Sequence, residues 1–309
     1  MNYENNHIKI IHKFAGALDI PILNYVKNKI IKNTKERSKK NIAKHYDLGN
    51  EFFSLWLDDT LTYSSAIFDD KKKDLSDAQN NKYQKLIDLI RPNNGDKVLE
   101  IGCGWGGFSS YAAKNYKSKI DAITISKSQF EYASQKIQKE GLGEKVSIKF
   151  KDYRDIDSQY SNIASIEMFE AVGKKYWEKY FDVIKNSLVT SGKAALQIIT
   201  IDEKRSLNYQ NQPDFIQQYI FPGGMLPTKK ELLEINQKVG LDFSEIKSFG
   251  QSYAKTLNMW NNQFQNSWQD LLLLGFNKRF KRMWEFYLAY CETGFISKST
   301  DVSHFLINK

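Results

Sequence analysis

A glycine-rich stretch in the first half of the chain has the composition of a cofactor-binding loop. Glu100-Ile101-Gly102-Cys103-Gly104-Trp105-Gly106-Gly107 follows a short apolar run and precedes a helix-like segment. Glycine lets a backbone approach a ligand closely, and the amino end of a helix favours a negative group. Gly102, Gly104 and Gly107 also fit the G-x-G-x-x-G spacing of dinucleotide-binding proteins, so the motif alone leaves NAD or FAD open.

The second predicted strand and Glu100 separate the alternatives for this loop. A dinucleotide enzyme places Asp or Glu at the end of the second strand, where it binds the ribose hydroxyls. This chain has Thr124-Ile125-Ser126 at that point, followed by Gln129. A carboxylate directly before the glycines resembles class I methyltransferases, where it works near the methionine end of S-adenosylmethionine. That resemblance implies that Lys151-Asp152-Tyr153 holds the adenine, and a helix cap is the other interpretation of Asp152.

Alternating strands and helices must position these residues, and the sequence predicts them from residue 97 onward. The predicted strands lie at 97–101, 119–125, 146–150, 163–168, 193–200, 243–249 and 301–307. Predicted helices between them lie at 108–116, 128–140, 176–188 and 228–239. Such alternation predicts an α/β fold, with a parallel sheet and helices on both faces.

Two segments interrupt this alternation and are predicted to be insertions. Residues 202–227 are polar and irregular. Residues 254–294 predict two helices with aromatic stripes, formed by Leu257, Trp260, Phe264 and Trp268 and then by Phe280, Trp284, Tyr287 and Tyr290. Stripes at this spacing usually pack in a core. The alternative is that they form the wall of a tunnel for an acyl chain.

The charge of the chain limits its partners. A net charge of +9 favours an anionic partner, either a nucleic acid or a phospholipid surface. Only six of the 45 basic residues are arginine, which argues against nucleic acid because base readout depends on bidentate arginine. Lysine-rich coding in an AT-rich genome is an equally simple origin of the charge.

The cysteines and the amino-terminal segment limit the location of the protein. Cys103 and Cys291 lie far apart and form neither a disulfide framework nor a metal-binding pair, so we expect no metal and a cytoplasmic setting. No run reaches the roughly 18 apolar residues that span a bilayer. Residues 1–40 predict a basic helical segment, broken at Pro21, which either packs on the domain or lies at a membrane surface.

Several stretches together resemble one family, the cyclopropane-fatty-acyl-phospholipid synthases and their mycolic acid relatives. They include HYDLGNEFFSLWLDDTLTYSSAIF (45–68), VLEIGCGWGGFSSYAA (98–113), IEMFEAVGKKYWEKYF (166–181), YIFPGGMLP (219–227) and YAKTLNMWNNQF (253–264). The resemblance covers residues 41–309. It implies a class I, seven-stranded methyltransferase sheet with added helices that roof an acyl channel. It also implies methyl transfer from S-adenosylmethionine to a cis double bond, and then proton removal from the carbocation by bound bicarbonate to close the ring.

The resemblance also implies which residues form the site. The cofactor would contact Tyr63, Ser64, Glu100, Gly102, Gly104, Gly106, Thr124, Ile125, Gln129, Asp152 and Tyr153. The bicarbonate would be held by Ser65, Glu170, Gln197, Ile199 and Tyr253. The simpler alternatives are a surface carboxylate at a helix start for Glu170 and a core hydroxyl for Tyr253.

Three positions depart from the pattern of the family. Ser65 replaces a cysteine found in many members, and Ala171 and Gln197 replace histidines. Ring formation is the first hypothesis for the product, and a methyl-branched, methylene or furan-precursor lipid is the alternative. The expected partners are unsaturated phospholipid acyl chains at the inner face of the membrane, with no nucleic acid and with a homodimer left open. An ordinary small-molecule methyltransferase and a non-catalytic lipid-binding module are the rival classes.

Overall fold

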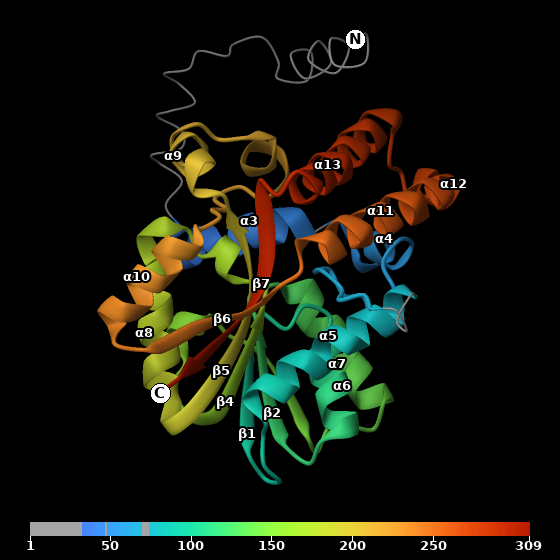
Figure 1. Ribbon diagram of the computed structural model, residues 1–309. Helices are drawn as coiled ribbons and strands as arrows, with labels where there is room; N and C mark the ends of the chain where they lie inside the picture. Colours follow the sequence, from blue (N-terminus) through green and yellow to red (C-terminus); the bar gives the residue numbers. More distant parts are fainter. Residues whose placement is uncertain (1–32, 47, 70–73) are drawn as a thin grey trace.

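The computed structural model describes residues 33–46, 48–69 and 74–309. Within these residues one sheet runs in the order β3-β2-β1-β4-β5-β7-β6 (Figure 1). Its strands are β1 (Lys97–Ile101), β2 (Lys119–Thr124), β3 (Val146–Phe150), β4 (Tyr160–Ile166), β5 (Leu188–Ile201), β6 (Asp242–Ser248) and β7 (Thr300–Asn308). This seven-stranded α/β sheet confirms the predicted fold class.

The sheet is mixed, so the expectation of a parallel sheet was wrong for β7, which runs opposite to the other strands. β1 to β5 pair in parallel, whereas β7 runs antiparallel to both β5 and β6. An apolar run indicates a strand but not its direction, because the direction is set by the connection that precedes it. Here α13 (Lys278–Ile296) and a short turn return the chain beside β5.

Helices cover both faces of the sheet, as the alternation predicts. One face packs against α5 (Leu75–Ile90), α6 (Gly107–Asn115) and α7 (Lys127–Lys139) around a core that includes Leu86, Phe108 and Ile137. The other face packs against α8 (Trp177–Ser187) and α10 (Lys229–Val239). α10 has a capping box between Thr228 and Glu231, which stabilises its start.

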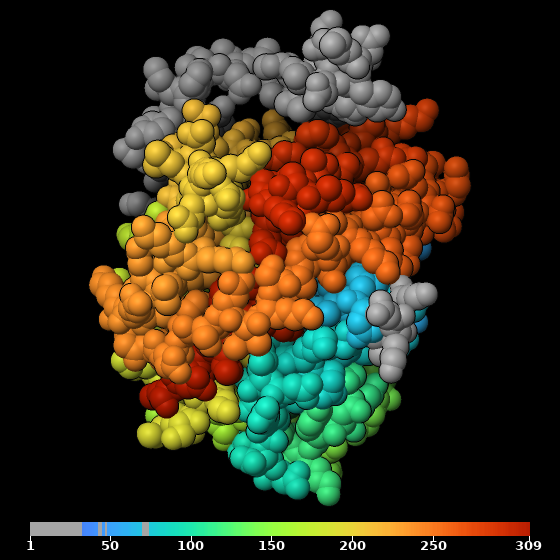
Figure 2. Space-filling view, in the orientation of Figure 1, coloured from blue at the N-terminus to red at the C-terminus, as the bar shows by residue number. Residues whose placement is uncertain are grey.

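A helical layer lies beyond the carboxyl ends of the strands (Figure 1), and its later segments, orange to red, form the upper right of the face shown in Figure 2. It contains α4 (Asn50–Ser54), α11 (Gly250–Asn266), α12 (Trp268–Leu273) and α13, and its aromatic side chains form the largest buried cluster. Residues 254–294 were expected to form two helices, but the structure adds α12 and begins α11 at Gly250. Trp260, Phe264 and Trp284 are buried here.

The segment 202–227 is more ordered than its polar composition predicts. It contains α9 (Glu203–Asn211), which Asp202 caps through Lys204 N, and a π-helical turn, η4 (Ile216–Ile220). Near the amino end, α3 (Lys35–Tyr46) runs across the boundary that the sequence suggested at residue 40. The helices predicted around Pro21 lie outside the described residues. None of the helices in the described ranges is long and apolar enough to cross a membrane.

Candidate active site

The site is a cavity of about 840 Å³ at the carboxyl ends of the strands. β1 lies between β2 and β4, so the chain crosses the sheet in opposite directions from this point. Ligands of open α/β sheets bind at such a point because the loops on the two sides diverge there. The cavity extends from the glycine loop to the segment around η4 and to the carboxyl-terminal half of α13.

The glycine loop forms one end of this cavity. Gly102 and Gly104 line it with φ angles of +82° and +51°, a region that glycine tolerates best. A Cβ built on Gly104 would meet no atom within 4 Å, so this backbone faces open space. Gly106 does not line the cavity; it caps α6 with φ +82°, and a Cβ there would meet Ala133 at 3.3 Å.

Glu100 lies beneath the loop and is almost fully buried. Burial raises its pKa to about 8, although Ser109 donates a hydrogen bond to Oε2 and Lys82 attracts the charge. A carboxyl group in this state gains its charge readily when a cation binds beside it. Glu100 is therefore suited to a positively charged ligand group, such as the ammonium or sulfonium of S-adenosylmethionine.

The residues after β2 lie at the same end of the cavity. Thr124, Ile125 and Gln129, which were expected to contact the cofactor, all line it. The Thr124 hydroxyl donates to Gln129 Oε1 at 2.9 Å, which holds the amide in place. No carboxylate lies in this group, which is consistent with the argument against a dinucleotide.

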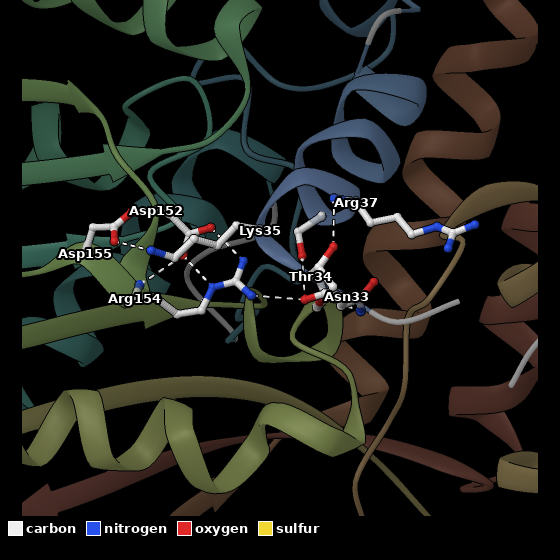
Figure 3. Close-up of polar contacts among 9 residues, drawn as sticks. Asn33, Thr34, Lys35, Arg37, Asp152, Arg154 and Asp155 are labelled. Atoms are coloured by element: carbon white, nitrogen blue, oxygen red, sulfur yellow. Dashed lines mark hydrogen bonds and ion pairs between the residues drawn. The ribbon is translucent and has the colours of Figure 1, made fainter. Parts of the chain in front are cut away.

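The residues expected to hold the adenine lie in a polar network that includes two residues the sequence did not indicate, Asn33 and Arg154 (Figure 3). Asp152 caps η1 (Tyr153–Asp155) and receives hydrogen bonds from Arg154 Nε at 2.8 Å and Nη2 at 2.7 Å. Burial favours the neutral acid, but Arg154 outweighs it and holds the pKa of Asp152 below its usual range. Arg154 Nη1 also donates to the carbonyl of Asn33 at 3.0 Å. Asp152 thus caps a helix and also lines the cavity, and contact with the adenine stays a prediction.

Asn33 closes the cavity above this network. Its amide donates to the carbonyls of Ala171 at 3.1 Å and Gly223 at 2.9 Å. Lys35, at the start of α3, forms an ion pair with Asp155 near Asn33 (Figure 3). Nothing in the sequence pattern links position 33 to residues 171 and 223, so the sequence did not predict these hydrogen bonds.

Tyr63 and Ser64 line the middle of the cavity. The hydroxyl groups of Tyr63 and Tyr287 form a hydrogen bond of 2.7 Å. The ring centroid of Tyr63 lies 5.4 Å from the ring centroid of Phe53 and 5.4 Å from that of Trp260. The Ser64 hydroxyl accepts a hydrogen bond from Lys82 Nζ at 2.7 Å. Lys82 is fully buried, and burial lowers its pKa to about 7.

Glu167 was not predicted as a site residue, yet it lies at the centre of the predicted anion site. Its Oε1 accepts from Ser65 N at 2.8 Å and Gln197 Nε2 at 2.7 Å, and its Oε2 accepts from the Tyr253 hydroxyl at 2.7 Å. Three of the five residues expected to hold bicarbonate therefore hold a side chain instead. The available indication was an acidic residue immediately after the buried strand β4.

Glu170 faces the same cavity from η2 (Phe169–Ala171), so it is not a carboxylate of the outer surface. Its Oε1 accepts from Ile199 N at 2.6 Å, while its buried Oε2 has no partner. Burial and then the charge of Glu167 raise the pKa of Glu170 to about 8. Burial also raises the pKa of Glu167, but hydrogen bonds from Tyr253 and Ser65 N and the charge of Lys82 oppose that shift.

Gln197 is held by a histidine from the last strand. His304 Nε2 lies 3.0 Å from Gln197 Oε1, and burial lowers the pKa of His304 to about 3. The neutral ring donates to the amide oxygen, which leaves the amide nitrogen to donate to Glu167. Ser65 and Gln197 are fully buried behind the cavity wall, whereas Ile199, Tyr253 and Tyr153 line it.

A family model described as mycolic acid cyclopropane synthetase matches residues 33–305. The chain belongs to this family. One relative is the tuberculostearic acid methyltransferase UfaA1 of Mycobacterium tuberculosis, 39% identical over 278 residues, or 87% of this chain and 65% of that protein. Another is the cyclopropane-fatty-acyl-phospholipid synthase of Escherichia coli K12, 36% identical over 251 residues, or 81% of this chain and 63% of that protein.

Solved structures agree with this membership. The mycolic acid cyclopropane synthase CmaA1, complexed with SAH and CTAB, superimposes with a TM-score of 0.82 and 27% identity, covering 88% of this chain and 98% of that one. The family match confirms the resemblance seen in the sequence, and the superposition confirms the class I methyltransferase fold. The chain spans just under two thirds of the length of the two curated relatives.

Proposed function

We propose that this chain transfers the methyl group of S-adenosylmethionine to a cis double bond in an unsaturated phospholipid acyl chain and forms a cyclopropane ring. The observation that supports this most is that one cavity joins a glycine cradle to an aromatic wall with two carboxyl groups. A small soluble substrate would not require a wall made of Tyr63, Leu257 and Tyr287, and a lipid-binding module would not require the glycine cradle.

The residues of the glycine end fit S-adenosylmethionine. Gly104 leaves open space for it, and Glu100 and Asp152 would hold its amino acid and adenosine ends. When bound, S-adenosylmethionine supplies an electrophilic methyl group on a positively charged sulfur.

The chain's own groups can assist attack by a weak nucleophile. An alkene reacts only when it is held close to the methyl group and when the developing positive charge is stabilised. The rings of Tyr63, Phe221 and Tyr287 line the cavity and offer this stabilisation at about 0.5–2 kcal/mol each, without a strong nucleophile that would trap the cation. The Tyr63–Tyr287 hydrogen bond fixes the orientation of the first ring.

Bicarbonate fits the site poorly. Ser65 N, Gln197 and Tyr253 are occupied by Glu167, and Ile199 N by Glu170. The proposed reaction therefore includes no step that involves bicarbonate, and bicarbonate stays a prediction of the family resemblance alone.

A second product class has support of its own. The first relative described above is named as a tuberculostearic acid methyltransferase, and the anion site departs from the family pattern at Ser65 and Gln197. A methylene or methyl-branched chain would arise from the same cation by loss of a different proton. A methyl-branched saturated product would also need a separate reductant.

Expression in a host without such enzymes tests the proposal. With methyl-labelled methionine, mass spectrometry of fatty acid methyl esters should show monounsaturated chains that gain one labelled CH2 unit. NMR then separates a ring from a methylene group, which has the same mass. Unchanged acyl chains beside a methylated soluble molecule would contradict the proposal.

The structure also offers a surface for the proposed membrane contact, which we place at the inner face of the membrane. Leu272, Leu273 and Leu274 are 40%, 86% and 41% exposed, and Lys278 follows them on α13. We call residues 272–282 the α12–α13 surface. Exposed leucines beside basic residues favour an anionic bilayer, because the side chains enter the lipid while lysines contact the head groups.

A further inference from the structure

The carboxyl group of Glu167 is fixed in the reaction cavity by hydrogen bonds. It lines the cavity, and three donors from three different parts of the fold hold both of its oxygens. Hydrogen bonds donated to a carboxylate favour its charged form, whereas burial favours the neutral acid. Burial raises the pKa of Glu167, and Lys82 adds a favourable charge that opposes this shift.

The backbone at Glu167 is held in a conformation that needs support. Its φ is +48°, in the left-handed region that residues other than glycine seldom occupy. Its N–H donates to the Gln197 carbonyl at 2.9 Å, so the same residue fixes both the backbone and the carboxylate. Such conformations persist only where the surroundings impose them, and they concentrate at functional sites.

We propose that Glu167 is the base that removes the proton from the methylated lipid cation, in the place where a bound bicarbonate was expected. This assignment rests on the proposed function. A C–H bond of the cation breaks, its electron pair forms the ring C–C bond or a C=C bond, and the proton goes to a Glu167 oxygen. The proton passes to water when the product leaves.

The three donors also explain how a carboxylate can serve beside a carbocation. Hydrogen bonds to both oxygens lower their nucleophilicity and hold the side chain in one rotamer, so it cannot swing onto the cation. Ser65 N, Gln197 and Tyr253 are therefore positioning residues in this assignment. His304 takes part indirectly, because it orients the amide of Gln197.

Two substitutions test the assignment. Glu167→Gln keeps the size of the side chain but removes the base, and we expect turnover to fall at least about 100-fold, the lower range for loss of a general base. Affinity for S-adenosylmethionine should stay within a few-fold. Glu167→Gly opens the space among the donors, so we expect a similar loss that added bicarbonate or formate partly restores. Glu178→Gln, which removes an exposed carboxylate paired with Lys238, is the matched control.

The carbonate dependence of the unaltered protein decides between the two bases. In carbonate-free buffer its rate should be unchanged, and added bicarbonate should not raise it. A rate that requires bicarbonate, or a Glu167→Gln variant with full turnover, would overturn the assignment while the proposed function stands. If the unaltered protein forms no lipid product in any buffer, the proposed function is rejected and the assignment with it.

Discussion

At the scale of single residues, the charge balance between Glu167 and Glu170 has a consequence for stability. The pKa of Glu170 rises from an ordinary 4.5 to about 8 in the folded protein, so the folded state binds this proton more tightly than the unfolded state. Its stabilising contribution is complete below about pH 4.5 and is lost as the pH rises towards 8.

Replacement of Glu170 by glutamine should therefore remove one contribution to the pH dependence of the protein's stability. Glu170→Gln keeps an acceptor for Ile199 N but cannot ionise. We expect the melting temperature of the variant, relative to the unaltered protein, to be higher at pH 8 than at pH 5. Thermal melting at the two pH values measures this difference, and an equal difference at both would mean that Glu170 titrates normally.

The open space above Gly104 leads to a second residue-scale prediction. Gly104→Val places two methyl groups where the ligand would lie, so S-adenosylmethionine binding should be lost. A residue forced to φ +51° costs roughly 1–2 kcal/mol, so some stability is also lost. Gly141→Val is the matched control, since Gly141 has φ +69°, no atom within 4 Å of its Cβ and no place in the cavity. Calorimetry should show that the Gly141→Val variant binds S-adenosylmethionine and that the Gly104→Val variant does not.

The sequence predicted which residues around the glycine loop would lie together, with the exception of Gly106, but it did not predict Glu167. Gly102, Thr124 and Asp152 follow strands, so their common position at one edge of the sheet follows from the alternation alone. Glu167 could not be assigned in this way, because its role depends on a left-handed backbone and on donors from residues 65, 197 and 253. Such long-range contacts have no local pattern.

At the scale of elements, the α12–α13 surface carries the membrane proposal. Leu273→Asp should weaken binding to anionic phospholipid vesicles at least about tenfold, since burying a leucine contributes about 1.5–3 kcal/mol. Leu233→Asp is the control, because Leu233 is 45% exposed on α10, away from this surface. Vesicle sedimentation compares the two variants, and equal losses would place the lipid contact elsewhere.

The elements themselves show what an apolar pattern can and cannot predict. β1, β2 and β3 appeared within one residue of their expected limits, because each is a buried run between turns. β5 begins five residues earlier than expected, at Leu188, where it pairs with Tyr160. α12 was missed because a six-residue helix has too few turns to show a period.

At the scale of the whole molecule, ligand binding should stabilise the fold. A ligand that binds only the folded state contributes about 2.7 kcal/mol at a hundredfold excess over its Kd. We therefore expect S-adenosylhomocysteine to raise the melting temperature by several degrees and NAD to leave it unchanged. If NAD raised the melting temperature instead, the interpretation of the glycine loop as a dinucleotide-binding site would be supported.

The position of β7 also determines when the protein can become active during its synthesis. β6 pairs with β7, and β7 alone connects it to β5, so residues 300–308 must leave the ribosome before either pairing forms. Until then β5 presents an unpaired edge, and such edges invite association between chains. His304 arrives with the same strand and completes the hydrogen bonds behind Glu167. Closure of the sheet and completion of the hydrogen bonds around Glu167 thus depend on the same strand.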